Sequence, residues 1–392
     1  MRAKLIIGSF LVVFMLSMLY LDTPNISAES WNSENTISPY PSPIVPSHQT
    51  SVPESTYKFY FPITKKSWRY LSCIVVPPYS MSKYVTDFGN NYDELYKVGC
   101  ELGHRAEALS GTQDFLIYLG FGQAYQFSDG EYGADLIHTR IKKRLSEIKE
   151  AVTRYANGFY LCSGNDRYSH LTIGIGISND SPYYTGSNHG SAWAEMVTQA
   201  SNMIYAYSSQ VSVVGGANIE LGMNGPSESR QWVDGYKNYI VTHGYVQFPL
   251  FVIGDAAGCR TINNNTNCGS ENYPDWETND VWYVNFGSGI SYPIPEIYTH
   301  DWVQAEQWYM LSLYSAGYTP EGPMLISGSF TQYLACQQEI NDPDCPLLDN
   351  APDDAYKMLY TILYSDPITR DVIDALIYPS DISYAPTPTP IP

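Results

Sequence analysis

The middle of the chain alternates short apolar runs with longer segments of helical periodicity. Strand-like apolar runs lie at 115–122, 171–177, 211–217 and 246–254, and most of them end at a carboxylate, an amide or a glycine. Between several of these runs, apolar residues recur at steps of three and four, as in an amphipathic helix. Continuous apolar strands that alternate with helices predict a parallel sheet covered by helices on both faces.

Four further strands complete the predicted sheet. They are expected at 72–76, 281–286, 294–298 and 324–327. The link between the sixth and seventh strands is too short for a helical crossover, and Pro293 and Pro295 interrupt the seventh. The sequence therefore predicts an α/β fold, a TIM-like (β/α)8 barrel that is irregular around strands six and seven. A doubly wound open parallel sheet is the alternative.

The two ends of the chain differ in composition from the middle. Residues 1–28 combine a basic head, an apolar run and a small-residue cleavage site, which is typical of a signal peptide, with an uncleaved anchor as the alternative. Residues 29–56 are rich in Ser, Pro and Thr and are expected to form a disordered tether. Residues 57–380 are expected to form a single barrel domain, followed by a Pro/Thr-rich tail at 381–392.

The composition narrows the class of protein. The net charge is −19 and the sequence pI about 4.6, which argues against a nucleic-acid partner. No later stretch is apolar enough to cross a bilayer, so the mature chain is expected to lack a membrane span and to be secreted or held at the cell surface. The chain has 35 Tyr and 8 Trp. Most of these rings are expected to fill the core, but their number favours carbohydrate as the ligand.

Seven cysteines fit an exported protein. The candidate disulfide residues are Cys259 and Cys268, Cys336 and Cys345, and Cys73 and Cys100. The first two pairs each flank a polar loop, and the third pair would leave Cys162 over. A zinc site would favour closely spaced pairs such as C-x-x-C, and none occurs, so no metal is predicted. The sequence does not settle the connectivity.

Acidic residues at the ends of the predicted strands are the candidate catalytic groups. They are Asp180, Glu220, Asp255 and Glu296. The carboxyl ends of barrel strands carry the active site in this fold, so these side chains are expected to meet at one rim. Each carboxylate could instead cap a helix or hydrogen-bond within a loop.

Polar and aromatic residues near the same strand ends are the candidate substrate-binding groups. They are Asn218, His189, Asn285, Trp282 and Tyr298. His189 precedes a helix and could simply cap it, and Trp282 could face either the barrel interior or the helices.

Several familiar sites are absent from the sequence. It has no G-x-S-x-G elbow, no P-loop and no H-E-x-x-H motif, and its glycine pairs lack the third glycine of a dinucleotide fingerprint. A serine hydrolase of the α/β-hydrolase type and a nucleotide enzyme are therefore unsupported, and no cofactor is predicted.

The order of the elements, the export signal and the positions of Glu220 and Glu296 resemble the glycoside-hydrolase-like barrels. In a large clan of these enzymes the acid/base closes the fourth strand and the nucleophile closes the seventh. The resemblance covers about residues 71–376 and implies these two roles for Glu220 and Glu296. In that clan an Asn directly precedes the acid/base, whereas Asn218 lies one residue too early.

Three functions fit these observations. The first is a secreted glycosidase that cleaves cell-wall or environmental polysaccharide with a carboxylate pair. The second is a non-catalytic barrel that binds glycan or cell wall, and the third is a surface scaffold protein. The fold alone does not choose among them, and the sequence gives no oligomeric state.

Overall fold

Eight parallel strands form a nearly closed barrel in the computed structural model, which describes residues 74–139, 141–180, 186–257, 259, 268, 275–338, 345–348 and 350–386. The strands are β1 (Ser80–Val85), β2 (Asp114–Gln126), β5 (His170–Ser178), β6 (Val211–Ile219), β7 (Leu250–Gly254), β8 (Ser291–Pro295), β9 (Gly328–Thr331) and β10 (Tyr378–Ala385). Their order around the barrel is β8-β7-β6-β5-β2-β1-β10-β9. A parallel bridge between Glu296 and Phe330 joins β8 to β9 and brings the barrel to near closure.

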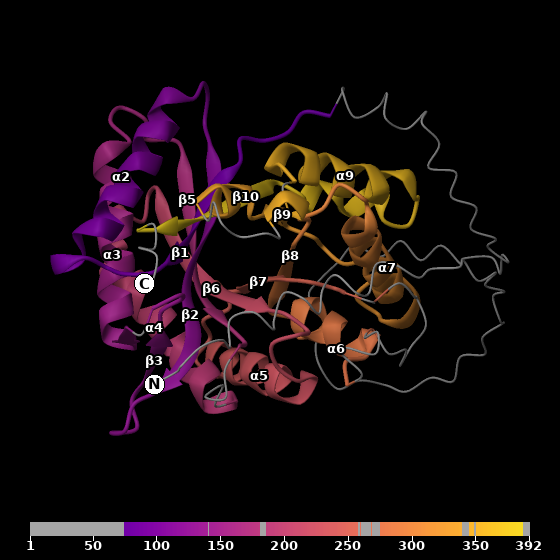
Figure 1. Cartoon of the computed structure of the whole chain (residues 1–392), viewed down its shortest axis with the longest axis horizontal. Helices are drawn as coiled ribbons and strands as arrows, with labels where there is room; N and C mark the ends of the chain where they lie inside the picture. The colour runs from indigo at the N-terminus through magenta and orange to yellow at the C-terminus, as the bar shows by residue number, and fades with distance from the viewer. Residues whose placement is uncertain are drawn as a thin grey trace, which may run out of the picture. The chain divides into compact units, whose positions relative to one another are not determined.

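Helices lie outside the strands and connect most of them (Figure 1). They are α2 (Asp93–Ala108), α3 (Leu145–Cys162), α4 (Ser187–Met203), α5 (Pro226–Thr242), α6 (Thr278–Trp282), α7 (Val303–Tyr318), α8 (Tyr333–Gln338) and α9 (Pro352–Ser365). The main core lies between strands and helices, where Trp193, Trp232 and Trp308 are fully buried. The predicted (β/α)8 barrel is therefore confirmed, and the open sheet is excluded.

A smaller cluster of apolar and aromatic side chains fills the barrel interior. The ring of Tyr118 on β2 lies over two glycines of the next two strands, β5 and β6: a Cβ on Gly176 would lie 2.0 Å from this ring, and one on Gly216 would lie 3.0 Å from it. These glycines therefore provide room for the ring. The interior is a packed core, as is usual for an eight-stranded barrel.

Strand β2 extends beyond the barrel into an antiparallel excursion that was not predicted from the sequence. The pairing of β2 shifts register between Gly120 and Gln123, and Gly122 adopts φ +81° at this bulge. Strand β3 (Tyr132–Asp135) then pairs with the extension, and β4 (Lys142–Arg144) pairs with β3 before α3 begins. The excursion carries Gln123 and His138 to the carboxyl end of the barrel, where the carboxylates lie.

The prediction of a strand at 281–286 is wrong, because these residues end α6 and form a π-helix, η5 (Tyr283–Gly287). A reciprocal capping box between Glu277 and Asp280 starts this helix, and a short apolar run fits a buried helix as well as a strand. The expected seventh strand corresponds to β8, the sixth in order, and the expected eighth lies just before β9, the seventh. The first strand was also expected too early, since β1 begins at Ser80.

Two prolines are accommodated in β8 because of the direction in which their nitrogens point. The Glu296 N–H bonds to Gly254 of β7, whereas the N–H of Ile297 points the other way and bonds to Phe330 of β9. Pro293 and Pro295 share the orientation of Ile297, so their missing donors face β9. The β8–β9 seam is accordingly reduced to one bridge, and this is where the barrel is irregular.

The eighth strand is β10, which contains residues 381–385 of the expected tail. It pairs with β1 on one side and β9 on the other, so the barrel extends to Ala385. The expected signal peptide and tether lie outside the described residues.

Three disulfides link Cys100 to Cys162, Cys259 to Cys268, and Cys336 to Cys345. The second and third were expected from their spacing. The expected Cys73–Cys100 pair is wrong, because packing of α2 on α3 brings Cys162 to Cys100, and Cys73 lies outside the described residues.

Across the described ranges, no helix combines the length and the apolar character needed to span a bilayer.

Candidate active site

Four carboxylates lie at the carboxyl ends of four neighbouring strands. Glu220, Asp255 and Glu296 directly follow β6, β7 and β8, and Asp180 lies two residues after β5. Because these strands are adjacent and parallel, the four side chains share one rim of the barrel. Glu220 closes the fourth strand, as the resemblance implied. Glu296 closes the sixth strand and not the seventh, because the strand expected at 281–286 is a helix.

The position of Glu220 is fixed by two asparagines. Asn179 holds its backbone: the Asn179 amide donates to the Glu220 carbonyl oxygen at 3.0 Å and accepts from the Glu220 N–H at 3.1 Å. The Asn218 amide donates to the Glu220 Oε1 at 2.9 Å. Desolvation, followed by the charge of Asp255, raises the pKa of the half-buried Glu220 to about 7.

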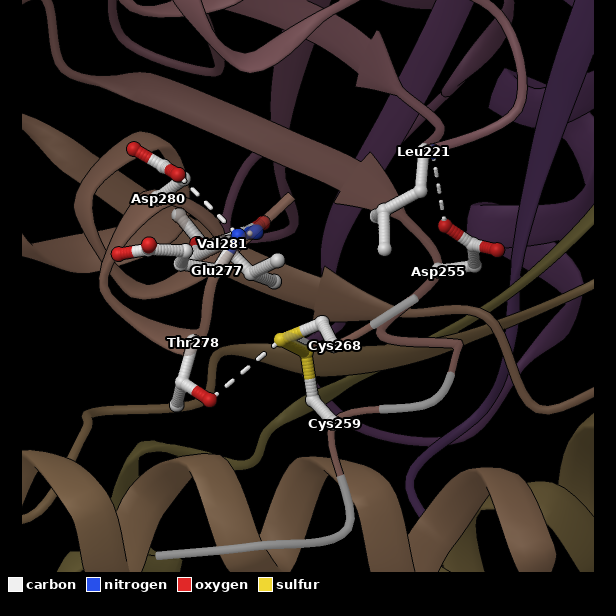
Figure 2. Close-up of a disulfide and its surroundings, with 9 residues drawn as sticks. Leu221, Asp255, Cys259, Cys268, Glu277, Thr278, Asp280 and Val281 are labelled. Atoms are coloured by element: carbon white, nitrogen blue, oxygen red, sulfur yellow. Dashed lines mark hydrogen bonds between the residues drawn. A yellow bond between two sulfur atoms is a disulfide. The ribbon is translucent and has the colours of Figure 1, made fainter. Parts of the chain in front are cut away.

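Asp255 lies beneath the chain that leaves β6. It is 8% exposed, and its Oδ1 accepts the N–H of Leu221 at 3.1 Å (Figure 2). Desolvation raises its pKa to about 6, and the backbone hydrogen bond from Leu221 opposes this shift. The hydrogen bond therefore favours the ionised form of Asp255, and the charge of Asp255 in turn favours the protonated form of Glu220.

The Cys259–Cys268 disulfide anchors the chain that follows Asp255. Figure 2 shows it beside the start of α6, with the hydroxyl of Thr278 3.5 Å from the Cys268 Sγ. The Cys268 N–H also donates to the carbonyl of Trp276 at 2.9 Å. These contacts tie the segment after β7 to the next helix.

Glu296 is the most enclosed of the four carboxylates. It is 3% exposed, and its Oε1 has no hydrogen-bond partner among the described residues. Desolvation raises its pKa well above the ordinary value, the charges of Glu220 and Asp255 raise it further, and a hydrogen bond with Tyr298 opposes the shift. Burial and the neighbouring charges therefore favour the protonated form of Glu296, which can donate a hydrogen bond.

Asp180 lies at the edge of the group. Its Oδ2 accepts a hydrogen bond from Gln123 of the β2 excursion at 2.6 Å, and burial raises its pKa. Its charge contributes to the raised pKa of Glu220, which places the two carboxylates in one electrostatic cluster.

Tyrosines form the inner wall of this cluster. The Tyr84 and Tyr384 rings lie 5.3 Å apart at the barrel mouth. Desolvation raises the pKa of Tyr84, Tyr118 and Tyr298, and in each case the charge of Glu296 is the next cause. The raised pKa values favour the neutral phenols, and of the three only Tyr298, which hydrogen-bonds with Glu296, was expected at the site.

His138 is a site residue that the sequence did not reveal. Its Nε2 lies 3.0 Å from the Tyr384 hydroxyl, and its backbone has φ +53° in the loop after β3. Non-glycine residues held in this backbone region cluster at functional positions. No motif surrounds it in the sequence, so only the β3–β4 excursion identifies it.

Three expected binding residues lie away from the carboxylates. His189 is fully buried: it accepts from the Trp232 indole at 3.0 Å, its Nε2 lies 3.0 Å from the Gly133 carbonyl, and desolvation lowers its pKa to about 4. Asn285 is buried in η5 and donates to the Val281 carbonyl at 2.9 Å. Trp282 faces α7, where its indole donates to Ser315 at 3.1 Å.

No protein-family model matches the sequence, and no curated protein matches it either. Among solved structures, oxaloacetate acetylhydrolase with bound oxalate is 11% identical at a TM-score of 0.35, covering 82% of this chain and 79% of that one. The chitinase ICChI from Ipomoea carnea is 10% identical at 0.35, with 78% and 94% covered. The spore cortex-lytic enzyme SleL of Bacillus megaterium QM B1551 is 10% identical at 0.34, with 79% and 70% covered. Similarity at this level carries no argument, and the fold rests on the strand topology described above.

Proposed function

We propose that this protein is an exported glycosidase whose carboxylates act at the mouth of the barrel. The observation that carries the proposal is that Asp180, Glu220, Asp255 and Glu296 end four adjacent parallel strands and so share one rim of the barrel. Within this group, the charge of Asp255 favours the protonated form of Glu220, whereas a backbone hydrogen bond favours the ionised form of Asp255. Hydrolysis of a glycosidic bond requires one protonated carboxyl group and one ionised carboxylate across the bond, and environments that separate their pKa values assign those roles.

In this mechanism Glu220 protonates the oxygen of the departing sugar. It is half-buried and therefore more accessible than Asp255 or Glu296, and Asn179 and Asn218 hold its orientation. The Asp255 carboxylate stabilises the positive charge that develops on the sugar ring. Neutral Glu296 and the surrounding phenols donate hydrogen bonds to sugar hydroxyls or carbonyl groups.

The three disulfides support the export part of the proposal, since such links persist in oxidising compartments. The tyrosines around Glu296 support a carbohydrate ligand, because rings pack on the apolar faces of sugars while their hydroxyls bind polar groups.

One observation favours a second candidate, a barrel that binds glycan without cleaving it. Asp255 and Glu296 are only 8% and 3% exposed, so a ligand would contact them mainly by displacing side chains at the mouth. A binding protein needs the rim of donors but no accessible carboxylate pair.

The test is the release of reducing ends from a panel of cell-wall and plant polysaccharides by the purified mature chain. We expect release by the parent protein and a loss of roughly 100-fold in Glu220→Gln, the scale of general acid catalysis. Glu195→Gln, on the exposed side of α4, is the matched control and should keep full activity. Binding of a glycan without release by the parent would exclude the glycosidase and support the second candidate.

A further inference from the structure

The helix pair α2–α3 carries a cluster that the proposed function does not use. Cys100 and His104 are one helical turn apart on α2, and Cys162 is the last residue of α3. Their two sulfur atoms and an imidazole nitrogen all lie within 4.8 Å of one another. Among the described residues, no other group of three His, Cys, Asp or Glu side chains is so placed. All three are at least partly exposed, so a solvated ion can reach them.

Two of these atoms are already separated as they would be in a tetrahedral zinc site. The Cys100 Sγ lies 3.6 Å from the His104 Nε2. Zinc–sulfur and zinc–nitrogen bonds of about 2.3 and about 2.05 Å, meeting at the tetrahedral angle, place sulfur and nitrogen about 3.5 Å apart. In the oxidised protein the Cys100–Cys162 disulfide leaves no thiolate to bind the ion. Reduction would supply two.

The backbone around the cluster is held by close helix packing as well as by the disulfide. A Cβ on Gly99 would lie 2.1 Å from a carbonyl oxygen of α3, and one on Gly158 would lie 2.2 Å from a carbonyl oxygen of α2. The helices therefore meet backbone to backbone next to the link. Because this contact does not require the disulfide, the Cα atoms of Cys100 and Cys162, 5.0 Å apart, remain within reach of one ion after reduction.

We propose that reduction converts the Cys100–Cys162 disulfide into a zinc site formed by both thiolates and His104, with water as the fourth ligand. A dithiol supplies two electrons and two protons to the disulfide, becomes a disulfide itself and leaves two thiols. Binding of Zn²⁺ then releases the two thiol protons to solvent. Oxidation by a second disulfide reverses the exchange and expels the ion. The helix pair thus holds a metal under reducing conditions and a covalent link under oxidising ones.

The experiment is a cobalt(II) titration of the full chain carrying Cys73→Ser, which removes the remaining thiol, before and after reduction with a phosphine under anaerobic conditions. We expect the visible bands of tetrahedral, thiolate-bound cobalt only after reduction, at one ion per chain, and their loss on addition of zinc. Cys162→Ser should abolish the bands, and His104→Ala should weaken binding at least 10-fold. The double variant Cys259→Ser/Cys268→Ser removes a different pair and should leave the titration unchanged.

Three results would overturn the proposal: no bands in the reduced parent, equal cobalt affinity in His104→Ala, or loss of the bands in the Cys259/Cys268 variant. Folding is followed separately by near-UV circular dichroism of the reduced protein. At the same zinc concentration, the unfolding temperature should rise more for the reduced parent than for reduced His104→Ala. A reduced parent that is unfolded and that zinc does not restore would also refute the site.

Discussion

At the scale of single residues, the pKa of Glu220 is set by opposing local effects. Burial and the charge of Asp255 favour the protonated form, whereas the hydrogen bond from Asn218 favours the ionised form. The hydrogen bonds of Asn179 hold the backbone of Glu220, and the hydrogen bond of Asn218 holds its carboxyl group. A group whose pKa lies near 7 for these reasons can both give and accept a proton near neutral pH.

Replacing Asn218 with alanine should raise the pKa of Glu220 further. A hydrogen bond to a charged group is worth about 1.5–3 kcal/mol, and one pKa unit is about 1.4 kcal/mol, so the expected rise is about one to two units. Carbon-13 NMR titration of the glutamate carboxyl groups measures it directly. Asn238→Ala, an exposed position on α5, should leave the titration unchanged. A fall in the pKa of Glu220 would show that Asn218 stabilises the protonated form instead.

Glu296 should make the protein less stable as the pH rises. Its folded-state pKa is raised well above the ordinary value, so above about pH 4 the unfolded chain loses a proton that the folded chain keeps. The free energy of unfolding therefore falls from about pH 4 upward until the folded-state pKa is reached. Glu296→Gln, a neutral mimic of the acid, should match the parent at pH 4 and unfold a few degrees higher at pH 8.

Thermal unfolding at pH 4, 6 and 8 tests this prediction, with Glu195→Gln as the surface control that should follow the parent at each pH. A Glu296→Gln protein that is less stable than the parent at pH 8 would mean that Glu296 is ionised and paired in the folded state.

At the scale of elements, burial determined which strands the sequence could predict. Strands β5 and β6 are covered on both faces, so their apolar runs are continuous and were located correctly. Strand β10 is equally buried but carries polar residues that hydrogen-bond to its neighbouring strands. Ser380 bonds with Ser82 at 2.6 Å, and Asp381 bonds with Thr331 at 2.8 Å. Those partners are distant in sequence, so nothing near β10 in the sequence showed that its polar residues are buried. Its last five residues were therefore assigned to the tail.

The same reasoning separates the site residues. Glu220 and Asp255 could be found because each directly ends an apolar strand. Tyr84 and Tyr384 lie on strands that were misplaced or missed, and His138 lies on an excursion with no apolar pattern of its own. The carboxylates could thus be predicted from the local sequence. The positions of the tyrosine and histidine rings could not, because they depend on which distant strands become neighbours.

The packing of α2 on α3 should be sensitive to a single methyl group. A Cβ on Gly99 would lie 2.1 Å from a backbone oxygen, which cannot move aside as a flexible side chain can. Gly99→Ala should therefore lower the free energy of unfolding by about 1–3 kcal/mol in urea denaturation. Gly317→Ala, in α7 with open space around it, should be neutral or stabilising by up to about 1 kcal/mol. Equal effects of the two substitutions would contradict the close contact.

At the scale of the whole molecule, two disulfides should contribute differently to stability and to the site. The Cys100–Cys162 link spans 62 residues and the Cys259–Cys268 link spans 9. Loop-closure entropy then assigns them about 4 and about 2.5 kcal/mol. Urea denaturation of the two Cys-to-Ser double variants should show the larger loss of stability for the first pair, and an equal or reversed order would contradict the entropic origin.

The two disulfides should rank in the opposite order in their effect on the pKa of Asp255. Cys259 lies four residues after Asp255, and the Cys268 contacts with Trp276 and Thr278 hold this segment against α6. Loss of this link exposes Asp255 to more water, which weakens the desolvation that raises its pKa to about 6. The pKa of Asp255, followed by carbon-13 NMR, should therefore fall toward about 4 in the Cys259/Cys268 variant and remain near 6 when the Cys100–Cys162 link is removed. Similar shifts in both variants would mean that a general loosening of the barrel, and not the local Cys259–Cys268 disulfide, controls the pKa of Asp255.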